Sequence, residues 1–169
     1  MNSVLAAWNE ADEAAALDAM LACCGARRWA AEMSALRPIA GVKELREAAD
    51  RAWSAMQEPD WLEAFACHPR IGDRKPADGR IRAAAWSKQE QAGTKAAGED
   101  ILAELAEGNR IYEEQFGFTY IICATGKSAE EMLAILKRRL AATREAELRE
   151  AAEQQRQIMQ IRLGKWIEE

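Results

Sequence analysis

Apolar residues recur at three- and four-residue spacing along most of this chain, a period typical of α-helices with one buried face. Over residues 43–57 the apolar positions that share a face are Leu45, Ala48, Ala49, Ala52, Trp53 and Met56. Near the end of the chain, a similar stripe contains Leu148, Ala151, Ala152, Met159 and Trp166. Arg162 falls within that second stripe, so the pattern predicts a positive charge on a buried helix face.

Capping residues and helix breakers set the bounds of the other helical stretches. Asn9, Ser128 and Thr143 are candidate N-caps, because their short side chains can accept a hydrogen bond from the first helical turn. Gly25 and Gly117 are candidate ends. Besides residues 43–57, helices are predicted over residues 10–24, 26–33, 60–67, 98–115, 129–140 and 145–163.

Residues 118–123, Phe-Thr-Tyr-Ile-Ile-Cys, form the only strongly β-prone run, and no partner strand is evident. Backbone groups that no sheet takes up must find other partners. The run is therefore either a pocket wall that binds a polar ligand through its main chain or a buried linker.

Length and charge limit the class of protein. A chain of 169 residues fits one domain over residues 1–169 with its own core. Its net charge of −5 and the lack of a long basic run favour neither a nucleic-acid nor an anionic-membrane partner. The four cysteines show no metal-binding spacing and fit buried thiols in a reducing cytoplasm. No stretch is long and apolar enough for a membrane span.

The candidate chemistry centres on His68, the only histidine, which follows an apolar helical stretch and precedes Pro69. Pro69 disfavours helical geometry at His68, so the helix is expected to end here and to present the imidazole on a turn. An imidazole exchanges protons near neutral pH, which suits acid–base catalysis. The alternative is a histidine that caps the helix carbonyls.

Two other polar groups have open interpretations. Ser87-x-x-Glu90 matches a capping box at a helix start, but Ser87, Glu90 and Gln91 at such an N-terminus are also suited to an anionic ligand. Arg162 is either half of a buried ion pair or the receptor for an anionic substrate, because a buried guanidinium stays charged and needs acceptors.

Five groups of residues, in this order, resemble the family of 2-oxo-4-hydroxy-4-carboxy-5-ureidoimidazoline (OHCU) decarboxylases. They are Trp29 with Arg37-Pro38-Ile39; His68-Pro69-Arg70-Ile71-Gly72-Asp73; Ser87-x-x-Glu90-Gln91-x-Gly93; Phe116-Gly117-Phe118 running into Ile122-Cys123-Ala124-x-Gly126-Lys127-Ser128; and Arg139-Leu140 with Ile158-x-x-x-Arg162-Leu163.

The resemblance implies a single compact all-α domain of roughly eight helices, often a homodimer. It implies a cofactor-free and metal-free decarboxylation of an anionic ureidoimidazoline in urate breakdown, which gives (S)-allantoin. By similarity His68 is the catalytic acid, Glu90 its partner in proton handling and Arg162 a substrate anchor. The implied substrate-binding residues are Pro69, Ser87, Gln91, Ile121, Ile122, Cys123 and Ala124. The chain lacks the peroxisomal ending of many eukaryotic members, so a cytoplasmic enzyme is expected.

Two non-enzymatic alternatives remain at this point. A histidine phosphotransfer module would need an exposed mid-helix histidine, and Pro69 argues against that placement. A helical interaction domain would tolerate His68→Asn without loss of function, whereas the decarboxylase interpretation predicts loss of activity in a folded variant.

Overall fold

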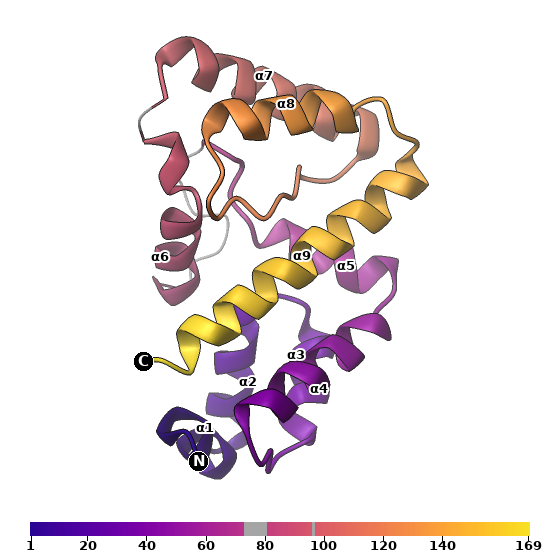
Figure 1. Cartoon of the computed structure of the whole chain (residues 1–169). Coiled ribbons are helices and arrows are strands. Elements are labelled where there is room, and N and C mark those ends of the chain that lie inside the picture. Colours follow the sequence, from indigo (N-terminus) through magenta and orange to yellow (C-terminus); the bar gives the residue numbers. More distant parts are fainter. Residues whose placement is uncertain (73–80, 96) are drawn as a thin grey trace. The chain divides into compact units, whose positions relative to one another are not determined.

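The computed structural model describes residues 1–72, 81–95 and 97–169, and within them the chain is helical and contains no strand. The predicted all-α class is confirmed (Figure 1). Nine α-helices and a 3₁₀ turn, η1, lie in these residues, against the roughly eight helices expected. Their bounds are α1 Ser3–Glu10, α2 Glu13–Cys23, α3 Arg27–Ala35, α4 Val42–Ser54, α5 Glu58–Ala66, α6 Ile81–Glu90, η1 Ala92–Thr94, α7 Glu99–Phe116, α8 Ala129–Arg139 and α9 Arg144–Trp166. Asp73, in the His68 motif, is outside the described residues.

The described residues group into two compact units. Unit 1 contains Met1–Ala64 and Arg156–Glu169, and unit 2 contains Phe65–Gln155. Two helices, α5 and α9, contribute residues to both units. No helix in the described residues combines the length and the apolar character that a membrane crossing requires.

In unit 1, α3 packs against α2 and α4. The indole of Trp29 is fully buried and donates a hydrogen bond to the carbonyl of Ala49, 3.1 Å away. Trp8 of α1 meets Trp166 of α9 edge to face, with ring centroids 5.8 Å apart. The apolar positions predicted for residues 43–57 are all buried, so the helical spacing identified this core face correctly.

The helix predicted over residues 10–24 is present as α2, Glu13–Cys23, but its predicted start and the predicted Asn9 cap are wrong. Asn2 caps α1 and Asp12 caps α2, each accepting a backbone hydrogen bond three residues on. Asn9 instead exchanges two hydrogen bonds, both 2.9 Å, with the backbone of Ile39. Its amide needed a distant partner that local sequence does not reveal.

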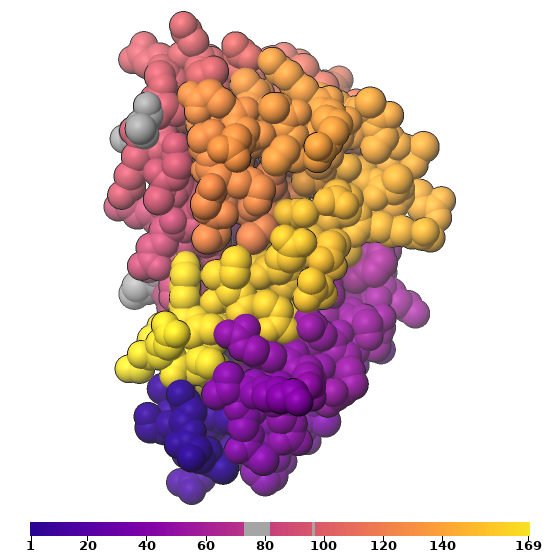
Figure 2. Space-filling view, in the orientation of Figure 1, coloured from indigo at the N-terminus to yellow at the C-terminus, as the bar shows by residue number. Residues whose placement is uncertain are grey.

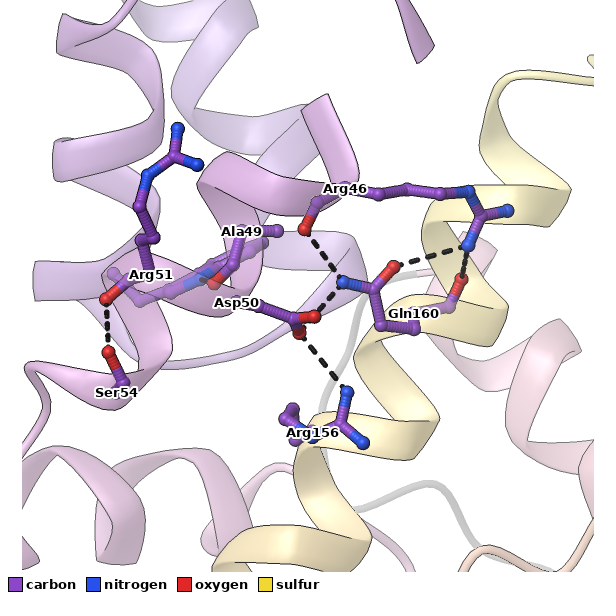
Figure 3. A network of polar contacts seen from close by, with 8 residues as sticks. Arg46, Ala49, Asp50, Arg51, Ser54, Arg156 and Gln160 are labelled. Atoms are coloured by element: carbon purple, nitrogen blue, oxygen red, sulfur yellow. Dashed lines mark hydrogen bonds and ion pairs between the residues drawn. The ribbon is translucent and has the colours of Figure 1, made fainter. Parts of the chain in front are cut away.

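A polar network joins α4 to the last part of α9 within unit 1 (Figure 3). The amide of Gln160 donates to the carbonyl of Arg46 and to the carboxylate of Asp50. Arg46 donates in return to the Gln160 carbonyl oxygens, and Arg156 pairs with Asp50 at 3.2 Å. These contacts fix the register of the two helices.

In unit 2, α7 and α8 lie side by side (Figure 1), and Gly108 of α7 gives room for the side chain of Leu136. Gly117, with φ of 82°, ends α7 as predicted. The residues of α8, orange in Figure 2, lie at the surface of that view, and Lys137 and Arg138 are exposed. Ser128 and Thr143 cap α8 and α9 as predicted.

The core of unit 2 contains a buried ion pair between Arg139 of α8 and Glu147 of α9. The hydroxyl of Tyr112 also donates to the Glu147 carboxylate. Arg139 stacks over the ring of Tyr120, 4.9 Å from its centroid. The carboxylate and the guanidinium thus each satisfy part of the other's hydrogen-bonding needs away from water.

Candidate active site

His68 lies just beyond the end of α5, as Pro69 predicts. The helix ends at Ala66, and the backbone N–H of His68 donates to the carbonyl of Phe65 at 3.1 Å. His68 is half-buried. This position differs from the exposed mid-helix placement that a phosphotransfer histidine needs.

The imidazole of His68 is held by a glutamine that sequence reasoning did not select. Oε1 of Gln155, on α9, lies 2.7 Å from Nε2 of His68. Gln155 is fully buried. Its contact with a residue 87 positions earlier orients the ring.

The turn after His68 is held by two further side chains. Oε1 of Gln91 accepts a hydrogen bond from the backbone N–H of Gly72 at 2.9 Å. The buried amide of Asn109, on α7, donates to the carbonyl of Ile71 at 3.1 Å. Gln91, a predicted substrate-binding residue, therefore also shapes the turn that carries His68.

Ser87 and Glu90 lie in the last turn of α6, not at a helix start, so the capping box is wrong, as is the N-terminal anion site. The buried positions of α6 include Ala83 and Trp86 as well as Ser87 and Glu90, which are 7% and 8% exposed. This i, i+3, i+4, i+7 spacing is one helical face that begins before Ser87. Both polar side chains thus point inward, and the backbone carbonyl of Ser87 accepts from Gln91.

The β-prone run has no regular secondary structure and pairs with no strand in the described residues, and side chains satisfy several of its backbone groups. Arg139 donates to the carbonyl of Ile121 at 2.7 Å. Gln154 accepts from the N–H of Cys123, and Lys127 donates to its carbonyl. At these three groups, side chains of the protein supply the partners that the pocket-wall alternative assigns to a ligand. The predicted binding residues of this run are all buried, namely Ile121, Ile122, Cys123 and Ala124.

Arg162 belongs to unit 1 and is 5% exposed, as the stripe on α9 predicts. Its Nη1 lies 3.4 Å from the carbonyl oxygen of Ala22.

Gln155 and Asn109 could have been found by the argument that selected Arg162. Gln155 lies on the stripe of α9 between Ala152 and Met159. Asn109 lies between Leu105 and Tyr112, both buried. A polar residue at an apolar position of a helix is a signal that needs no homologue. In the described part of the chain, no three His, Cys, Asp or Glu side chains are grouped so as to hold a metal ion.

Comparison with known proteins places these residues in a family. The model of the OHCU decarboxylase family matches residues 9–164. A crystal structure of an OHCU decarboxylase in the presence of (S)-allantoin is 34% identical, with a TM-score of 0.78 over 90% of this chain and 99% of that one. A crystal structure of an (S)-allantoin synthase, 19% identical with a TM-score of 0.68, shares the fold.

Among curated relatives, the uric acid degradation bifunctional protein TTL of Arabidopsis thaliana is 37% identical over 144 residues, 85% of this chain. The chain spans 44% of that relative's length and 28% of the bifunctional protein PucL of Bacillus subtilis. A mouse protein named 2-oxo-4-hydroxy-4-carboxy-5-ureidoimidazoline decarboxylase is 28% identical, and the match covers 79% of this chain and 75% of that one.

Proposed function

The chain belongs to the OHCU decarboxylase family, and from this premise we propose that it decarboxylates 2-oxo-4-hydroxy-4-carboxy-5-ureidoimidazoline to (S)-allantoin and carbon dioxide. The observation that carries the proposal is the match, at 34% identity and over 99% of its length, to an OHCU decarboxylase whose crystal structure was determined in the presence of (S)-allantoin.

The reaction needs a proton donor with a fixed position. When the bond to the carboxylate breaks, its electron pair moves into the conjugated system of the imidazoline ring. A proton must then reach one face of the carbon that becomes the stereocentre. We assign this proton delivery to His68, whose ring is fixed by Gln155 at 2.7 Å.

The buried carboxylate of Glu90 is the proposed partner of His68 in proton handling. It is 8% exposed and belongs to the same unit as His68. A carboxylate favours the protonated imidazole and gives the reaction a second acid–base group. The proposed anchor for the acidic group of the substrate is Arg162, because its guanidinium remains charged at every relevant pH.

The remaining predicted residues are proposed to bind the rest of the substrate. Ser87 and Gln91 would bind polar groups of the ring and ureido chain, and Pro69 would pack on the ring. The buried segment Ile121, Ile122, Cys123 and Ala124 would complete the site. The proposed chemistry uses neither a metal nor an organic cofactor.

Stereoselective product formation tests the proposal. The unstable substrate is generated in place from urate, and circular dichroism at a wavelength where allantoin absorbs follows the product. With the wild-type protein we expect a rapid single-handed signal. With His68→Asn we expect the rate to fall by about 10²- to 10⁴-fold, the usual contribution of a general acid.

Glu90→Gln removes the charge and the acid–base function of the Glu90 side chain but keeps its size, since the amide can still form hydrogen bonds and cannot exchange a proton. We expect a large loss of rate for this variant. Glu114→Gln on α7, which changes an exposed carboxylate in the same way, should retain full rate. Racemic product at the uncatalysed rate with the wild-type protein would refute the proposed function.

A homodimer and a cytoplasmic location are further proposals, both from the family resemblance. Light scattering coupled to size-exclusion chromatography tests the dimer, and a monomer at micromolar concentration would refute it. Fractionation of cells that express the chain tests the location.

A further inference from the structure

Only one of the two polar atoms of the Gln155 side-chain amide has a hydrogen-bond partner among the described residues. Its oxygen lies 2.7 Å from Nε2 of His68, but its nitrogen has no hydrogen-bond partner among the described residues. Gln155 is 0% exposed, so water does not reach this nitrogen from the surface. A buried donor without a partner costs about 1–3 kcal/mol, and nearly all such groups in folded proteins are paired.

The orientation of the amide has a chemical consequence for His68. An amide oxygen only accepts hydrogen bonds, so Nε2 of the neutral imidazole must carry the proton. Turning the amide around would place the nitrogen against the imidazole. Nε2 would then be the acceptor and Nδ1 would carry the proton. The tautomer of His68 therefore reports which end of Gln155 faces the ring.

We propose that Gln155 is a residue of the active site, which holds His68 as the Nε2-protonated tautomer through its oxygen and donates its amide hydrogens to a carbonyl or carboxylate oxygen of the ligand. The donor role rests on the proposed function, whereas the positioning role does not. Oxygen and nitrogen belong to one planar group, so a ligand oxygen about 2.9 Å from the nitrogen lies beside the imidazole edge. The Gln155 side chain would thereby fix the position of the ligand relative to the imidazole ring of His68.

The position of Gln155 on α9 supports a functional role for this residue rather than a purely structural one. The stripe that contains Gln155 is otherwise made of buried apolar residues together with Arg162. A leucine or methionine at position 155 would fill the same space without an unpaired donor. The retained amide is explained if a ligand pairs with it.

The first test is the tautomer, measured by nitrogen-15 NMR above the pH at which the imidazole titrates. His68 is the only histidine, so its two ring nitrogens give the only imidazole signals. We expect the wild-type protein to show Nε2 protonated. Nδ1 protonated instead would overturn the proposal, and this result needs neither substrate nor variant.

Two variants then separate the roles. Gln155→Glu can still accept from Nε2 but donates nothing, so the tautomer should persist. Gln155→Met can neither accept a hydrogen bond from Nε2 nor donate one to a ligand, and we expect both neutral tautomers of His68 to be populated in this variant. The matched control Gln115→Met replaces an exposed glutamine on α7 that donates to the carbonyl of Leu140. It should leave the signals of His68 unchanged.

The probe for the donor role is (S)-allantoin, which carries carbonyl oxygens and no charge. We expect both Gln155 variants to bind it about ten- to a hundredfold more weakly than the wild-type protein, because each leaves a ligand oxygen unpaired. Equal affinity in Gln155→Glu would overturn the donor role. If the wild-type protein binds no allantoin, the donor role fails, whereas the stereoselective assay decides the proposed function and the tautomer decides the positioning role.

Discussion

Gly93 lies so close to the backbone of Lys127 that a methyl group at position 93 would overlap the Lys127 carbonyl oxygen. The contact joins the turn η1, which follows Glu90 and Gln91, to the segment before α8. Gly93 is therefore required for a close approach of two backbones, not for its own conformation.

Gly93→Ala should destabilise the protein, because the neighbour that must move is backbone. We expect a loss of about 1–3 kcal/mol in the free energy of unfolding, measured by urea denaturation. The matched control is Gly164→Ala, whose new methyl group would meet only the far end of the Arg46 side chain. That variant should be neutral or up to about 1 kcal/mol more stable, since alanine favours a helix. A Gly93→Ala protein as stable as the wild type would show that the two segments separate easily.

Breaking the buried ion pair should be costly. Glu147→Gln leaves the guanidinium of Arg139 buried without its counter-charge, so we expect the free energy of unfolding to fall by about 3–5 kcal/mol. The matched control, Glu114→Gln, breaks the exposed pair with Arg110 and should change the free energy of unfolding very little, because solvent screens that pair. Chemical denaturation measures both, and similar losses would contradict the assigned burial.

The effect of Glu147→Gln should reach the irregular segment of residues 118–123. Arg139 also donates to the carbonyl of Ile121, so a displaced guanidinium would release that carbonyl. Amide hydrogen exchange should then accelerate around residue 121.

Alkaline pH should unfold the protein through its two tyrosines. Burial raises the pKa of Tyr112, and its hydrogen bond to Glu147 raises it further. Burial also raises the pKa of Tyr120, against the opposing charge of Arg139. The pKa values of both phenols therefore exceed the ordinary tyrosine value of about 10. The neutral phenols therefore stabilise the folded state fully below about pH 10, and this contribution is lost as pH rises towards the folded-state pKa.

The measurement is a pH titration that records tyrosinate absorbance and helical circular dichroism together. We expect tyrosinate to form only as the helical signal disappears. Tyrosinate that forms near pH 10 in a fully helical protein would contradict the burial of both phenols.

Sequence was sufficient where a structure depends on neighbours in the chain. Ser128 and Thr143 cap their helices, and Gly117 ends α7, because each acts within one turn. The buried stripe of α9, including Arg162, follows from the same local geometry.

Local signals failed where a distant partner decides. Asn9 looked like a cap, but it is bound to Ile39, 30 residues away. Ser87-x-x-Glu90 has the spacing of a helix start and also that of a helix face, and only burial distinguishes them. Gln155 could not be assigned to His68 from sequence, because the two are 87 residues apart.

Because of the chain connectivity, the residues of unit 2 are all synthesised before those of unit 1 are complete. Unit 2 is contiguous, Phe65–Gln155, so all of its residues are made before the last part of unit 1. Unit 1 must wait for Arg156–Glu169, which brings Trp166 to Trp8 and Gln160 to Asp50. The first 64 residues thus leave the ribosome with part of their core missing. In a nascent chain stalled before residue 156, we expect unit 2 to be folded and resistant to proteases, and the incomplete unit 1 to be cleaved by them.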